Sequence, residues 1–194
     1  MLSKFWIDLT SDDINKLGKN KVLILPFSSV EQHGDHLPSG TDKLILDGIL
    51  NTFIKNNPKL NNFLVLPNIS IGSASEHNSF EGTISSSSTN YIDYVISVIE
   101  ELCIRKYKKF VFLNSHGGQI SHLDIAAKEI KSVYKNVDIV KAHYFLFKGF
   151  ENFFLFSKFF WEVFSFLYFQ VSSQAVRPVC GQPTGLYFCI FVFA

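Results

Sequence analysis

The chain has 194 residues, a formal net charge of +1 and a hydrophobic fraction of 47%. This length suits one sizeable α/β domain, and the hydrophobic fraction is normal for a globular protein. The near-neutral charge and the lack of any run of lysines or arginines give no reason to expect a nucleic-acid partner.

The cysteines and the amino-terminal region indicate a protein of the cytoplasm. Cys103, Cys180 and Cys189 show no paired metal-ligand spacing, and an odd number of cysteines does not suit a disulfide framework. Residues 1–19 include three aspartates and have no basic region followed by an apolar stretch, so they do not resemble a signal peptide. We therefore expect a cytoplasmic protein that is not secreted.

Up to about residue 142 the sequence alternates between short apolar runs and longer segments of helical period. Residues 10–13 predict a helix cap near the start of the chain. Apolar spacing then predicts helices over about 46–54, 92–103 and 123–134. Between them we expect strands at Val22–Phe27, Phe63–Leu66, Phe110–Leu113 and Val137–Val140. This alternation is typical of an α/β fold built from βαβ units.

The sequence changes character from Tyr144, and we divide the chain into an α/β domain over 1–142 and an atypical, aromatic-rich tail over 143–194. Phenylalanine dominates residues 145–169, a stretch long enough to span a bilayer. Four charged residues lie on one face of that stretch and are costly in lipid, so we do not expect a membrane span. An amphipathic, buried helix or an altered tail are the alternatives.

Three segments that follow predicted strands carry the residues of chemical interest, and these segments are 31–42, 72–83 and 114–118. In open α/β sheets, ligands bind beyond the carboxyl ends of the strands, so residues at these positions can meet although they are distant in sequence. Four of the six histidines belong to these segments: His33, His36, His77 and His116.

The first segment favours a metal site. Glu31, His33 and Asp42 offer oxygen and imidazole donors, and without a metal they would leave several polar groups to satisfy in one crowded turn. A single histidine such as His36 or His77 could instead be a hydrogen-bonded structural residue. The glycines at 117 and 118 could form an anion cradle at a helix amino terminus, but the lysine of a phosphate-binding loop is absent.

The order and spacing of three motifs resemble the creatininase (creatinine amidohydrolase) family. The motifs are Glu31-Gln-His-Gly-x-His-Leu-Pro-x-x-x-Asp42, Ser75-Glu-His77 with Phe80-x-Gly-Thr83, and Asn114-x-His-Gly-Gly118. The resemblance covers about residues 5–142. It implies a three-layer α/β/α fold with a mainly parallel sheet, a two-metal site that hydrolyses amide or other C–N bonds, and homo-oligomers, commonly hexamers.

The resemblance also implies roles for seven side chains. The implied metal ligands are Glu31, His33, Asp42 and His116, and the implied catalytic residues, which would orient ligands or move protons, are His36, Glu76 and His77. Asp42 would bridge two divalent ions, for which zinc, manganese and iron all suit the donors. A metal-bound hydroxide would then attack a small-molecule amide, peptide-like or not.

The sequence departs from the family pattern at two places. Creatininases themselves carry a metal-binding glutamate at the position of Gly118, although other members share the double glycine seen here. A later His-Ala-Gly-x-x-Glu segment of the family is not found after Lys141. Two alternatives follow. The protein could be a catalytically impaired or truncated member that keeps only metal or ligand binding, and the tail could result from a shifted reading frame.

Overall fold

The computed structural model describes residues 2–146, which form a four-stranded sheet with helices on both faces. The strands are β1 (Val22–Phe27), β2 (Phe63–Val65), β3 (Lys109–Asn114) and β4 (Asp138–His143). The α-helices are α1 (Ser11–Lys16), α2 (Thr41–Asn56), α3 (Ser88–Ile104) and α4 (Ile120–Val133), and four 3-10 turns, η1 to η4, accompany them. The predictions made for the aromatic-rich tail after Leu146 lie outside the described residues.

All strand pairs are parallel, and their spatial order is β2-β1-β3-β4. The chain therefore moves outward from β1 to β2 and then crosses back to place β3 on the other side of β1. The point at which a parallel sheet reverses its winding lies here between β1 and β3. Ligands of open α/β sheets bind at this point, beyond the carboxyl ends of the strands.

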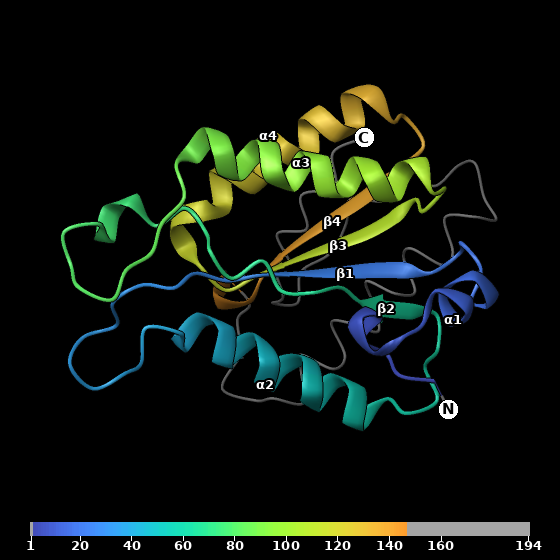
Figure 1. Ribbon diagram of the computed structural model, residues 1–194, viewed down its shortest axis with the longest axis horizontal. Coiled ribbons are helices and arrows are strands. Elements are labelled where there is room, and N and C mark those ends of the chain that lie inside the picture. The colour runs from blue at the N-terminus through green and yellow to red at the C-terminus, as the bar shows by residue number, and fades with distance from the viewer. Residues whose placement is uncertain (1, 147–194) are drawn as a thin grey trace, which may run out of the picture.

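The helices form two layers that enclose the sheet (Figure 1). On β1, Leu23, Leu25 and Phe27 belong to the apolar cluster that includes α3 and α4 residues, whereas Val22 and Ile24 belong to the cluster that includes α2 residues. Successive side chains of a strand point to opposite faces, so a strand that is buried on both faces is apolar throughout. The predicted three-layer α/β/α fold is confirmed.

Most predicted elements lie within a few residues of the observed ones. The predicted helix cap near the start is confirmed, because Thr10 and Asp13 form a reciprocal capping box at the beginning of α1. The last strand begins at Asp138 and continues to His143, three residues beyond its predicted end. It does so because its backbone pairs with β3 as far as Asn114, which lies opposite His143.

The connection between α3 and β3 contains a residue in the left-handed region. Lys106 has a φ of 72°, and it is the only non-glycine residue with a positive φ in residues 2–146. Its N–H donates to the carbonyl of Cys103, and the N–H of Tyr107 donates to that of Leu102, which together end the helix in a Schellman motif. Glycine usually occupies this position.

The described part of the chain has no helix that is both long and apolar enough to cross a membrane. This finding concerns residues 2–146. The expectation of a cytoplasmic location is not tested by it.

Candidate metal centre

The loop after β1 returns to the sheet and begins α2, and this path brings two distant carboxylates together. Glu31 follows β1 and is held by a 3.0 Å hydrogen bond from its N–H to the carbonyl of Ser39. Asp42 is the second residue of α2. Their side chains are almost fully buried, with exposed fractions of 7% for Glu31 and 6% for Asp42. Buried carboxylates need charged or metal partners.

His116 reaches the same place from β3, the strand next to β1. It lies two residues beyond the end of β3 and is 3% exposed. Its Nδ1 lies 3.0 Å from Glu31 Oε1 and 3.5 Å from Asp42 Oδ2. One donor atom from each of Glu31, Asp42 and His116 lies within 4.8 Å of the others. We call these three residues the carboxylate–histidine cluster.

His33 faces Oδ1 of Asp42, the carboxylate oxygen that His116 does not face. Its Nε2 lies 3.3 Å from Asp42 Oδ1 and 3.8 Å from Glu31 Oε1. Its Nδ1 donates a hydrogen bond of 3.1 Å to the Glu31 carbonyl, which can only accept. This bond keeps the proton on Nδ1, so in the neutral ring the lone pair of Nε2 faces the carboxylates.

The two carboxylates contain the atoms that favour a cation. Glu31 Oε2 and Asp42 Oδ2 are buried and accept no hydrogen bond from the described residues. Such atoms are costly unless an ion or another partner satisfies them. Imidazole and carboxylate donors suit zinc, manganese and iron. These observations show that the residues present fit a divalent metal ion.

The charges of the cluster shift its pKa values in opposite directions. Burial alone would raise the pKa of Glu31, but the hydrogen bond from His116 and the neighbouring histidines lower it below its usual value. Burial and the charge of Glu31 raise the pKa of Asp42. Burial would lower the pKa of His116, but the hydrogen bond to Glu31 and the nearby carboxylates outweigh it and raise that pKa. Perturbed values of this kind are common at functional sites.

Several hydrogen bonds hold the turn that carries His116. Asn114 Oδ1 accepts hydrogen bonds from the backbone N–H of His116 and from Gln119 Nε2, at 3.0 and 2.8 Å. Asn114 Nδ2 donates to the carbonyl of His116 and to His143 Nδ1. No role was predicted for Asn114, Gln119 or His143. The position of Asn114 in the third motif, directly after the predicted strand that ends at Leu113, was the available signal.

His77 lies at the edge of the cluster, in the 3-10 turn η2 (Ser75–His77). Its Nε2 is 3.9 Å from Glu31 Oε2. Gln32 orients the ring: its Oε1 accepts a hydrogen bond from the N–H of Gly34, so its Nε2 donates to His77 Nδ1 over 3.1 Å. In a neutral His77 the proton therefore lies on Nε2, facing the site. This position suits a proton donor better than a metal ligand.

The remaining predicted site residues differ in position. Glu76 lies beside the cluster, with Oε1 3.4 Å from His116 Nε2, and its side chain is 44% exposed. His36 is exposed and makes no hydrogen bond or ion pair with the described residues, so the structure does not bring it to the cluster. Gly117 and Gly118 lie in the turn η3 (Gly117–Gln119) before α4. The roles predicted for these residues, including the anion cradle, stay predictions.

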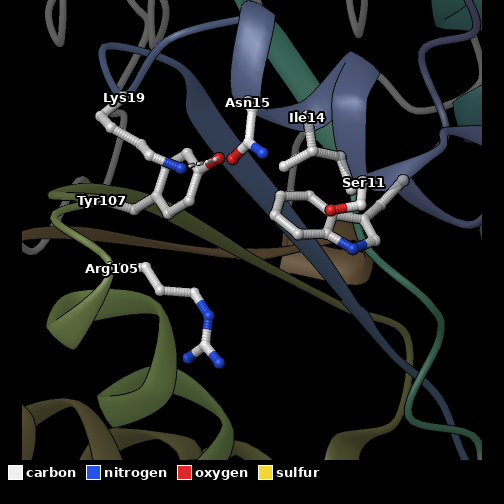
Figure 2. Close-up of a pocket in the computed structure, with 7 residues that line it drawn as sticks. Ser11, Ile14, Asn15, Lys19, Arg105 and Tyr107 are labelled. Atoms are coloured by element: carbon white, nitrogen blue, oxygen red, sulfur yellow. Dashed lines mark hydrogen bonds between the residues drawn. The ribbon is translucent and has the colours of Figure 1, made fainter.

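A separate pocket of about 400 Å³ lies beside α1, at the end of the sheet where β1 and β3 begin (Figure 2). The two cationic residues of its lining already have partners. Lys19 Nζ lies 4.6 Å from the centre of the Tyr107 ring, and Arg105 pairs with Glu101. The carboxylate–histidine cluster lies at the opposite ends of these strands, so this pocket is not part of the candidate metal centre.

Comparison with known proteins supports the resemblance that the motifs carry. A family model described as creatinine amidohydrolase (creatininase) matches residues 7–176. The chain belongs to the creatininase family. The matched range continues past residue 142, where we placed the domain boundary, and that boundary stays a prediction. Members of the family are hydrolases that act on amide bonds.

Individual relatives share parts of the chain. The mycofactocin precursor peptide peptidase of Mycolicibacterium smegmatis is 30% identical over 107 residues, which are 54% of this chain and 43% of the relative. A solved creatinine amidohydrolase (creatininase) has a TM-score of 0.67 at 22% identity, covering 74% of this chain and 59% of that one. A structure described as "Creatininase Mn" has a TM-score of 0.63 at 24% identity, with the same coverage of 74% and 59%.

These likenesses confirm the fold of the creatininase family for the described residues. The chain spans less than half of the curated peptidase and about three fifths of the solved creatininases that it matches. The activity and the substrate of this chain are therefore matters for proposal.

Proposed function

We propose that the chain is a metal-dependent amidohydrolase that cleaves the C–N amide bond of a small molecule, peptide-like or not. The observation that carries this proposal is the buried carboxylate–histidine cluster at the point where the sheet reverses its winding. Two of its carboxylate oxygens lack a hydrogen-bond partner among the described residues. The proposal extends the family's chemistry to this chain.

The surroundings of Asp42 support a site for two ions. Its Oδ1 faces His33 Nε2 at 3.3 Å, while its Oδ2 faces His116 Nδ1 at 3.5 Å. A carboxylate with its two oxygens directed at different histidines suits a bridge between two cations. We assign Glu31 and His116 to one ion, His33 to the other, and Asp42 to both.

Divalent ions at this site would lower the pKa of a water molecule and polarise the carbonyl group of the substrate. The residues of the chain then hold the site in shape and move protons. The Glu31 carbonyl keeps His33 in the tautomer whose Nε2 faces the cluster. His77, held by Gln32, presents Nε2–H at the edge of the site and is the proposed proton donor to the leaving amine.

The substrate is proposed as a class only. Relatives whose names describe a precursor peptide peptidase and creatinine amidohydrolases match the same chain. Both names describe cleavage of a C–N bond next to a carbonyl group, and this shared chemistry is what we assign. Assembly into homo-oligomers such as hexamers is a further proposal that rests on the resemblance alone.

Metal analysis of the purified full-length chain, combined with hydrolysis assays on cyclic amides, formamides and short peptides, tests the proposal. We expect close to two ions per chain and loss of hydrolysis after chelation, with recovery on adding zinc or manganese. One ion or none, with no hydrolysis of any class, would instead favour the alternative of an impaired member that only binds a metal or ligand.

A further inference from the structure

Glu76 lies in a space that exists only because residue 118 is glycine. A Cβ atom at Gly118 would overlap the carboxylate of Glu76 and would lie 2.6 Å from Nε2 of His116. At the neighbouring Gly117, by contrast, no atom lies within 4 Å of the corresponding position. Neither glycine has a positive φ, so space rather than backbone conformation separates the two positions.

The Glu76 carboxylate lies beside Nε2, the ring nitrogen of His116 that points away from the cluster. Glu76 Oε1 is 3.4 Å from Nε2, and the carbonyl of Ser73 is 3.1 Å from the same nitrogen. The carbonyl can only accept a hydrogen bond, so Nε2 carries a proton. The other ring nitrogen, Nδ1, faces Glu31 and Asp42. A metal ion in the cluster can therefore bind His116 only through Nδ1.

We infer that Glu76 is a positioning residue for His116, and that Gly118 is required because it leaves room for the Glu76 carboxylate. This inference rests on the proposed metal site. Metal-binding histidines commonly donate their second N–H to a carboxylate or a carbonyl, which sets the tautomer, orients the ring and makes the bound nitrogen more basic. Here Ser73 and Glu76 supply both kinds of acceptor from the loop between β2 and α3.

The test measures zinc affinity of the full-length chain by competition with a chelator. Glu76→Ala should weaken zinc binding by about 10- to 100-fold, the usual effect of removing such a partner. Glu76→Gln keeps an acceptor oxygen but loses the charge, so it should restore part of the affinity. Glu81→Ala is the matched control, because Glu81 is exposed on the same loop and has no described partner.

A second pair of variants tests the role of the glycine. Gly118→Ala should weaken zinc binding to a similar extent, whereas Gly117→Ala should leave it unchanged because its Cβ meets open space. Nitrogen-15 spectra of the histidine rings supply a readout that does not depend on activity. In the wild-type protein with zinc, His116 should carry its proton on Nε2, and Glu76→Ala should weaken that signature.

The outcomes separate the inference from the proposed function. Zinc binding by Glu76→Ala as tight as by Glu81→Ala, or by Gly118→Ala as tight as by Gly117→Ala, would overturn the inference and leave the metal site standing. Failure of the wild-type chain to bind zinc would overturn both.

Discussion

Replacing Asp42 with asparagine should change the stability of the protein in opposite directions with and without metal. Burial and the charge of Glu31 raise the pKa of Asp42, so the charged carboxylate is disfavoured in the folded state. A carboxyl group with a raised pKa in the folded state lowers the free energy of unfolding as the pH rises. The loss begins near the pKa of the unfolded state and ends above the pKa of the folded state. Once the pH exceeds the folded-state pKa of Asp42, this loss is complete. Without metal, Asp42→Asn should therefore be at least as stable as the wild type.

With metal present the order should reverse. A ligand at a free concentration of 100 times its Kd stabilises the folded state by about 2.7 kcal/mol. For a chain of this size, 1 kcal/mol corresponds to about 2–4 °C in Tm, so zinc should raise the wild-type Tm by about 5–11 °C. In Asp42→Asn most of this increase should vanish, because both oxygens of Asp42 face histidines of the site.

Thermal unfolding in a chelator and in excess zinc measures both effects. Asp47→Asn is the matched control on α2, because Asp47 is half-exposed and, among residues 2–146, forms only a surface ion pair with Lys43. It should keep the full increase in Tm with zinc. The reasoning would be refuted if Asp42→Asn kept a wild-type increase, or if it were destabilised equally in chelator and in zinc, since the second result indicates a purely structural role.

Two further predictions concern the backbone and the pH. Lys106→Gly should stabilise the protein by up to about 1 kcal/mol in denaturant unfolding and leave zinc binding unchanged, because glycine adopts the φ of 72° without strain. A loss of stability would contradict this. Burial would lower the pKa of His116, but its hydrogen bond to Glu31 and the charges of the nearby carboxylates together raise it. In chelator, stability should therefore decline as the pH rises above 6.5, and Glu31→Gln should flatten that decline; an unchanged slope in the variant would count against the assignment.

The local part of the site could be predicted from the sequence. Glu31, His33 and Asp42 lie within 12 residues of one another, and few other roles account for so many donors in one turn. His116 is 85 residues from Glu31, yet both directly follow strands of an α/β pattern, and parallel strand ends meet at one edge of the sheet. The structure brings them to 3.0 Å.

Hydrogen-bond partners across loops could not be predicted in the same way. The carbonyl of Ser73 that holds His116, and the side chain of Gln32 that orients His77, depend on how two loops pack against each other. No spacing rule encodes that packing. His36 belongs to the same motif as His33, but it is exposed and makes no hydrogen bond or ion pair with the cluster.

The sequence by itself determined the order of strands and helices and the donor-rich motif, because apolar periodicity and residue type are local properties of a chain. Only the tertiary structure decided which atoms face one another. The two oxygens of Asp42 point to different histidines, and the carboxylate of Glu76 fills the space beside Gly118. These arrangements come from the packing of three segments that are separated by tens of residues in the chain.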